Sequence, residues 1–309
     1  MGITRSILLW GSRSQQLREI LPRYRFVRKA VSRFMPGEEI GAALEAAEIL
    51  RENGIASILT HLGENVTEET EADQITRHYR EVLDHVRTRG LDCQISVKLT
   101  QLGLDLSPEL GYTNLRSIAD HAAGLQNFVW IDMEASAYTD LSLELFRRAR
   151  SEYPNIGICL QSYLYRTAHD LDTLLPLSPA IRLVKGAYAE PESVAFQKKK
   201  DVDANFLALA TQLLGKARQD GVWPVFATHD RGLIRRLQEE TATIGLSKEA
   251  SEFQMLYGIR REDQIRLARE SYRVRVLISY GTAWFPWYMR RLAERPANVL
   301  FVLRNLVGR

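Results

Sequence analysis

Cysteine is scarce in this chain, and the scarcity excludes several kinds of protein. Only two cysteines occur among the 309 residues, Cys93 and Cys159, and each lies in an apolar run typical of a buried strand. Two cysteines exclude a disulfide framework and a zinc site built on cysteine pairs, and they suit a reducing cytoplasm. We interpret both as core residues rather than nucleophiles.

Long hydrophobic runs and a strong net charge are also missing. No stretch approaches the roughly 20 apolar residues of a transmembrane helix, and the run at residues 7–10 is too short for a signal peptide. We therefore expect a cytoplasmic protein, soluble or peripheral on the inner face of the membrane. The net charge is only +3, and acidic residues alternate with basic ones, so we expect no nucleic-acid partner.

Two binding motifs are absent as well. The six histidines show neither H-x-H nor H-E-x-x-H spacing, so we expect no metal site. No G-x-G-x-x-G follows the first apolar runs, which removes the usual dinucleotide fingerprint of an open doubly wound sheet.

What the chain does contain is a regular alternation of short apolar runs and helical segments. Residues 1–53 are predicted to form a helical arm that ends before Asn53-Gly54. Eight candidate strands follow, at 55–62, 93–99, 127–133, 156–161, 180–186, 223–228, 251–257 and 274–280. Helical periodicity separates them, for instance at 68–89, 141–152, 203–219, 231–244 and 261–270. This pattern favours a single (βα)8 barrel over residues 54–309, with an open doubly wound sheet as the alternative.

Polar residues gather at the carboxyl ends of the predicted strands, where parallel barrels place their functional groups. In chain order they are Glu64, Lys98, Gln101, Asp132, Glu134, Gln161, Lys185, Tyr188, Thr228, His229, Asp230 and Gln254. An unpaired ammonium inside a barrel is costly, so Lys98 requires a partner, and Asp132 lies at the matching level. The pair is either purely structural or also serves a ligand carboxylate near Lys98.

Three further features allow two interpretations each. His229 is either a satisfied core histidine or a cofactor contact. The stretch Arg182 to Tyr188, "RLVKGAY", is either a tight turn or a place where Gly186 and Ala187 admit a flat or phosphorylated ligand, with Arg182 and Lys185 supplying positive charge. Arg290 and Arg291 follow an aromatic-rich segment and are either surface charges or ligands for a carboxylate beside an apolar ring.

Seven motifs in chain order resemble those of the one-domain bacterial proline dehydrogenases, over residues 38 to 307. They read "SVKLTQLGLDLS", "IDMEAS", "GICLQSYLYRT", "IRLVKGAYAEP", "FATHD", "EFQMLYG" and "RRLAERPAN". The resemblance implies a distorted (βα)8 barrel that binds FAD and oxidises L-proline to Δ1-pyrroline-5-carboxylate by hydride transfer from C5 to flavin N5. It further implies a membrane quinone as electron acceptor and pyrroline-5-carboxylate dehydrogenase as the downstream enzyme. Fused forms of the family carry an aldehyde dehydrogenase domain or bind DNA, and we expect neither in 309 residues.

The resemblance also implies roles for individual residues. Lys98, Arg290 and Arg291 would bind the substrate carboxylate, Asp132 would hold Lys98, and Tyr188 would cover the substrate ring. Glu64 would pair with one of the arginines as a gate. The implied flavin contacts are Met133, Gln161, Arg182, Lys185, Gly186, Ala187, Thr228 and His229, with Glu294 near the adenosine. A cation at Arg182 or Lys185 would favour the anionic reduced flavin.

One position departs from the family pattern. Leu277 in "RVRVLISYG" stands where the family commonly has a tyrosine that closes over the substrate ring. Leu277 thus leaves open a flavin-dependent barrel enzyme for another cyclic imino acid, such as hydroxyproline, or for a folate derivative. A catalytically silent barrel retained as an interaction module is the alternative from a different class.

Overall fold

The fold is a closed parallel barrel. The computed structural model describes residues 31–219, 221–285 and 287–289. Each strand pairs in parallel with the next one in the chain, and β8 pairs with β1, so the (βα)8 barrel is confirmed and the open sheet is excluded. The strands are β1 (Ala56–His61), β2 (Cys93–Val97), β3 (Val129–Ile131), β4 (Ile156–Gln161), β5 (Ala180–Val184), β6 (Trp223–Ala227), β7 (Glu252–Leu256) and β8 (Arg273–Tyr280).

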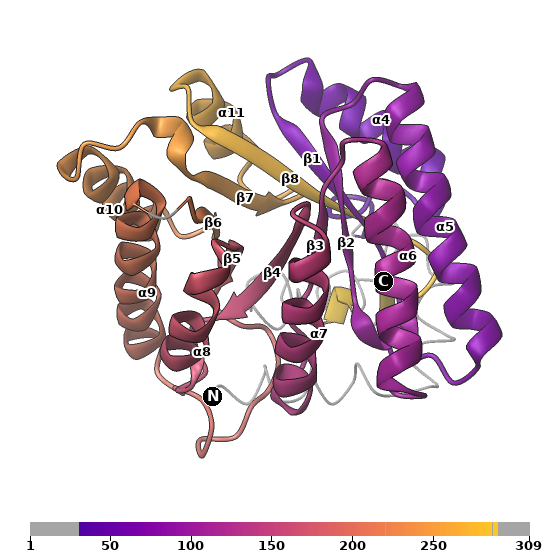
Figure 1. The fold of residues 1–309 in the computed structure, drawn as a ribbon. Helices are drawn as coiled ribbons and strands as arrows, with labels where there is room; N and C mark the ends of the chain where they lie inside the picture. The colour runs from indigo at the N-terminus through magenta and orange to yellow at the C-terminus, as the bar shows by residue number, and fades with distance from the viewer. Residues whose placement is uncertain (1–30, 220, 286, 290–309) are drawn as a thin grey trace, which may run out of the picture.

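Helices surround the barrel (Figure 1). They are α4 (Ile40–Arg51), α5 (Glu69–Thr88), α6 (Pro108–Gly124), α7 (Thr139–Glu152), α8 (Thr167–Leu174), α9 (Lys199–Gln219), α10 (Arg231–Thr243) and α11 (Arg261–Arg269). Each amphipathic helix buries its apolar face against the strands, which makes the layer between strands and helices the main hydrophobic core. In α4, for instance, the buried residues include Ala43, Leu44, Ala47 and Leu50.

Most of the predicted strands ran one or two residues too far at their carboxyl ends. Lys98, placed inside a strand by the apolar pattern, lies just beyond β2 and precedes a 3-10 turn at Leu99–Leu102. The turn ends at Gly103, whose φ of 95° suits glycine. Asp132 likewise follows β3, although its backbone N–H still bonds to the Val97 carbonyl at 2.9 Å. Polar side chains at these ends therefore leave the wall and turn toward the mouth of the barrel.

The barrel is distorted at its closure. In a regular (βα)8 barrel the helix after β8 covers β8 and β1, but here α4, which precedes β1, packs against those two strands. The segment after β8 packs elsewhere: Trp284, Tyr288 and Met289 join Met35 and Leu62 in a separate apolar cluster. Leu62 directly follows β1, so this segment lies at the carboxyl-terminal mouth.

The inside of the barrel is unusually polar. A small apolar cluster there contains Ile58 and Trp130 with Leu277 against it, but Arg182 and Arg275 are also buried on inward-facing positions. Among the described residues, none of the helices combines the length and apolarity needed to cross a bilayer.

Candidate active site

Three charged side chains meet inside the carboxyl-terminal half of the barrel. The Asp132 carboxylate lies between Lys98, whose Nζ is 3.6 Å from Oδ2, and Arg182, whose Nη2 donates to Oδ1. The predicted Lys98–Asp132 pair is therefore present. Arg182 is only 3 % exposed, and a guanidinium so deeply buried requires a carboxylate partner.

Two neighbours complete this charge cluster, and neither was singled out from the sequence. The Ser96 hydroxyl lies 2.8 Å from Asp132 Oδ1 and 2.9 Å from Arg182 Nη2. The Arg182 guanidinium also lies over the Trp130 ring, 5.1 Å from its centre, where cation–π attraction stabilises a buried cation. Ser96 precedes Lys98 by two residues and Trp130 precedes Asp132 by two, so strand alternation was the available signal.

Gln161 stands at the end of β4 and is buried beside this cluster. Its Nε2 donates to the carbonyl oxygens of Met133, at 3.2 Å, and Glu134, at 3.0 Å. Its Oε1 is buried and has no hydrogen-bond partner within the described part of the chain. A buried acceptor that meets no donor costs free energy, so this oxygen suits an N–H group of a bound molecule.

Glu134 is the most perturbed carboxyl group near the cluster. It accepts hydrogen bonds from the Thr100 backbone N–H at 3.1 Å and from the Thr100 hydroxyl at 2.6 Å. Burial raises the pKa of Glu134 to about 7, and the negative charge of Glu64 acts in the same direction. The two hydrogen bonds from Thr100 and the positive charge of Lys98 oppose this rise. Glu64, in the loop after β1, therefore lies within electrostatic reach of the same mouth.

The raised pKa of Glu134 predicts a pH-dependent stability. The unfolded chain releases this proton at its ordinary pKa, so the folded state binds more protons above that value and loses stability as pH rises toward 7. Glu134→Gln removes this titration. The free energy of unfolding of the variant minus that of the parent should therefore be about 2–3 kcal/mol more favourable to the variant at pH 8 than at pH 5, measured by thermal unfolding. Glu109→Gln, at an exposed carboxylate, is the control. If Glu134→Gln and the parent differ in free energy of unfolding by the same amount at pH 5 and pH 8, the raised pKa of Glu134 is contradicted.

The loop after β5 approaches its neighbours closely. Gly186 has a φ of 116°, and a Cβ built on it would lie 2.4 Å from Cδ1 of the Tyr163 ring, so only glycine fits there. Ala187 and Tyr188 follow and are partly buried. The close approach of the Tyr163 ring accounts for glycine at this position, as a tight turn also would, so the second interpretation of this stretch stays a prediction.

Lys185 is more heavily paired than the sequence indicated. Its Nζ lies 2.5 Å from Asp203 of α9 and 3.1 Å from Asp230 at the start of α10. Although burial opposes it, Lys199 and Lys185 hold the pKa of Asp230 below its usual range. Of the two cations predicted in this stretch, Arg182 faces the barrel interior and Lys185 anchors the loop to two helices.

The loop after β6 holds Thr228 and His229. The Thr228 hydroxyl accepts from the Asp230 backbone N–H at 3.2 Å, and His229 Nε2 accepts from the Leu256 backbone N–H at 2.9 Å. This bond keeps Nε2 unprotonated, so a neutral His229 carries its proton on Nδ1. Both residues thus lie at the carboxyl-terminal mouth, where the sequence placed them.

Leu277 lies on the inner face of β8. It is partly buried and packs against the cluster that contains Ile58 and Trp130, and the Trp130 ring also lies under Arg182. Leu277 therefore belongs to the same interior as the charge cluster. Arg290, Arg291 and Glu294 lie outside the described residues, one or more positions beyond Met289.

Comparisons with known proteins agree on one family. The family model described as "Proline dehydrogenase" matches residues 43–304. The chain is 38% identical to "Proline dehydrogenase 1" of Bacillus subtilis (strain 168) over 304 residues, 98% of this chain and 99% of that protein. It is also 38% identical to "Proline dehydrogenase" of Deinococcus radiodurans over 280 residues, 89% of each chain.

Solved structures show the same fold. Proline utilization A (PutA) from Bdellovibrio bacteriovorus, inactivated by N-propargylglycine, superposes with a TM-score of 0.82 at 24% identity, covering 94% of this chain and 36% of that one. A PutA mutant from Bradyrhizobium japonicum gives a TM-score of 0.75 at 22% identity, covering 89% of this chain and 32% of that one. Given the family model and the relatives across nearly its full length, the chain belongs to the proline dehydrogenase family.

Proposed function

We propose that this protein oxidises L-proline to Δ1-pyrroline-5-carboxylate as a flavoenzyme with FAD, the first step of proline catabolism. The observation that carries the proposal is the cluster of Lys98, Asp132 and Arg182 at the carboxyl-terminal mouth, in which both cations are buried. Relatives of nearly equal length that bear the name proline dehydrogenase support the substrate. Burying the two cations Lys98 and Arg182 has a large desolvation cost, so the cluster argues against a silent barrel.

The residues at the mouth suit a flavin. FAD, when bound, accepts the hydride and so supplies the redox chemistry. Gln161 Oε1 offers a buried acceptor, and we propose that the partly buried loop at Gly186 and Ala187 lies against the flavin. Arg182 offers a buried cation, which stabilises the electron-rich reduced ring. We propose Met133, Thr228, His229 and Lys185 as further contacts, and Glu294 near the adenosine.

Cations would also recognise the substrate. We propose that Lys98, Arg290 and Arg291 bind the carboxylate of proline, with Asp132 holding Lys98 and Tyr188 covering the ring. Met289 packs in the cluster that contains Leu62, so the chain reaches the carboxyl-terminal mouth immediately before Arg290. We further propose that Glu64 pairs with one of the two arginines and gates the bound substrate.

These cations also act on the protonation of the substrate. Loss of hydride from C5 requires the lone pair of the ring nitrogen, so proline must bind with its nitrogen unprotonated. Cations around the carboxylate offset its desolvation and disfavour a second positive charge at the adjacent nitrogen. We therefore assign no residue as a general base.

We propose a quinone at the membrane surface as electron acceptor and pyrroline-5-carboxylate dehydrogenase as the enzyme that uses the product. A protein that meets its acceptor at the membrane surface would be cytoplasmic and peripheral on the inner face. The proposed reaction is tested by incubating the flavin-loaded protein with L-proline and a soluble quinone analogue. Reduction of the quinone analogue is measured, and the product is identified by mass spectrometry. A protein that binds no flavin would instead be a silent barrel.

Leu277 favours a second candidate substrate, 4-hydroxyproline. Because leucine lacks the hydroxyl and reach of tyrosine, it leaves more room beside the substrate ring. We expect Leu277→Tyr to lower kcat/KM for 4-hydroxyproline relative to L-proline by about tenfold, since one substituent in a pocket is worth about 1–3 kcal/mol. Leu277→Met, which conserves volume, is the control. An unchanged ratio of the two kcat/KM values in Leu277→Tyr would refute a role for this position in specificity.

A further inference from the structure

A continuous line of polar side chains extends from Arg182 toward the opposite end of the barrel. Besides Asp132 and Ser96, Arg182 contacts Gln254 of β7, with 3.5 Å between Nη1 and Oε1. Gln254 is only 2 % exposed. A buried guanidinium keeps one orientation only while acceptors face its N–H groups, so the direction of the Gln254 oxygen matters to Arg182.

The orientation of Gln254 is set by Glu252, two residues earlier on the same face of β7. Gln254 Nε2 donates to Glu252 Oε1 at 2.7 Å. If the amide were reversed, its oxygen would face a carboxylate and its N–H groups would face those of Arg182, two repulsive contacts. The Glu252 carboxylate, which only accepts, therefore holds the Gln254 oxygen toward Arg182.

Glu252 is in turn fixed by an ion pair. It is 2 % exposed, and Arg275 Nε lies 3.1 and 3.2 Å from its two oxygens. Arg275 also donates through Nη1 to the Ser57 carbonyl at 3.1 Å and to Asp92 Oδ1 at 2.8 Å. A carboxylate and a guanidinium with this many partners have little rotational freedom.

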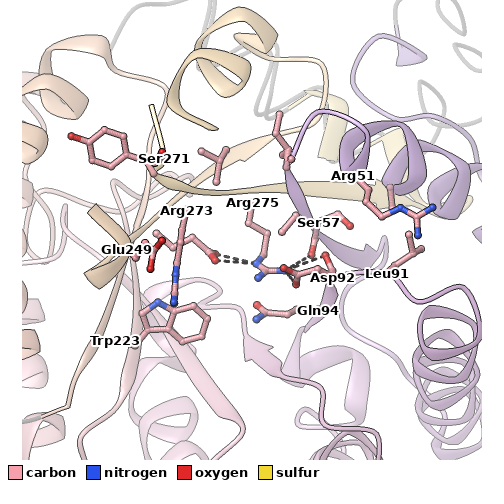
Figure 2. Close-up of a pocket in the computed structure, with 17 residues that line it drawn as sticks. Arg51, Ser57, Leu91, Asp92, Gln94, Trp223, Glu249, Ser271, Arg273 and Arg275 are labelled. Carbon is pink, nitrogen blue, oxygen red and sulfur yellow. Dashed lines mark hydrogen bonds and ion pairs between the residues drawn. The ribbon is translucent and has the colours of Figure 1, made fainter. Parts of the chain in front are cut away.

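The line ends in a cavity at the amino-terminal mouth. Figure 2 shows Arg275 reaching toward Ser57 and Asp92, with Trp223 nearby. The cavity measures about 760 Å³ and is lined by the first residues of β1, β6, β7 and β8. The candidate active site lies at the other end of the barrel, so the ion pair of Glu252 with Arg275 is remote from the substrate.

We propose that Glu252 is a positioning residue: through Gln254 it fixes the direction in which Arg182 presents its guanidinium to the bound flavin. The redox properties of the flavin then depend on an ion pair at the amino-terminal end of the barrel. This inference rests on the proposed flavoenzyme function. Glu252 itself contacts neither substrate nor flavin.

A double-mutant cycle on the flavin-loaded protein tests the proposal. Glu252→Gln removes the charge that orients Gln254, and Gln254→Met removes the link while leaving the pair of Glu252 with Arg275 intact. We expect either change to weaken stabilisation of the reduced flavin about tenfold, equal to a potential about 30 mV more negative for a two-electron couple. In the Gln254→Met background, Glu252→Gln should have no further effect on that potential.

The control is Arg273→Gln, which removes an exposed cation of the same mouth and the same strand and should leave the potential unchanged. An equal shift from Glu252→Gln in both backgrounds, or no shift in either, would overturn the proposal. If Glu252→Gln does not fold, Gln254→Met decides alone, and a parental potential refutes the link. Reduction of the parent's flavin by L-proline tests the proposed function separately, because it does not depend on the variants.

Discussion

Asp132→Asn is expected to lower kcat/KM for L-proline by about 10²–10³-fold, the largest effect of any single change considered. Asp132 lies between two cations, Lys98 and Arg182. Asparagine keeps the shape but removes the charge, so both cations lose their partner and repel each other. Leaving buried cations without their carboxylate costs about 3–5 kcal/mol of folding stability. A displacement of these groups by about 1 Å is enough to lower the rate roughly 10²-fold.

The effect of Asp132→Asn should appear mainly in kcat. A freed Lys98 still attracts the substrate carboxylate, so KM should change little. The displaced cations alter the geometry of the reacting atoms, and this change lowers kcat. Asp140→Asn is the matched control, because Asp140 also binds an arginine, Arg166 at 2.5 Å, but its side chain is 82% exposed. We expect the control to stay within about twofold of the parent. Equal kinetics for the two variants would contradict a central role for Asp132.

The second large effect is expected for Lys98→Met. Lys98 is proposed to bind the substrate carboxylate directly, and a hydrogen bond to a charged group contributes about 1.5–3 kcal/mol. KM for L-proline should therefore rise by about 10- to 100-fold, with a smaller change in kcat. Steady-state kinetics over a range of proline concentrations measures both.

Two further measurements separate binding from folding in Lys98→Met. Lys199→Met removes another ion-paired ammonium, whose side chain is 71% exposed, and should leave KM near the parental value. Added methylammonium should partly restore the lost affinity of Lys98→Met by supplying a cation in place of Nζ. A parental KM in Lys98→Met would mean that the carboxylate is bound elsewhere.

Strand ends were the part of the site that could be predicted from the sequence. The alternation of apolar runs and helical segments predicts parallel strands, and the carboxyl ends of parallel strands meet at one mouth of the barrel. Lys98, Asp132 and Gln161 were identified because they lie at such ends. The Lys98–Asp132 pair followed from the cost of burying an unpaired ammonium. These inferences need only local periodicity and one rule about parallel sheets.

Contacts across the barrel could not be predicted in the same way. Arg182 on β5 reaches Ser96 on β2 and Gln254 on β7, and no local pattern records which residues face each other once the barrel has closed. The pairing of Lys185 with Asp203 similarly depends on where α9 begins. Tertiary packing therefore determined the partners of residues whose positions were already predicted.

The same limit applies to the closure of the fold. Periodicity identified the helix of α4, but it does not specify that this helix covers β1 and β8. That placement frees the segment after β8 to pack near Leu62 at the carboxyl-terminal mouth. The aromatic residues before Arg290 marked this segment as unusual, whereas its position relative to the barrel required the structure.

Anaerobic titration of the flavin-loaded protein with L-proline tests the central claim most directly, because it requires cofactor and substrate to react in the same site. The proposed function predicts that the visible absorbance of the oxidised flavin bleaches as L-proline is added and reaches full reduction at saturation. If the absorbance stays unchanged at saturating L-proline although dithionite still reduces the bound flavin, the proposed function is contradicted.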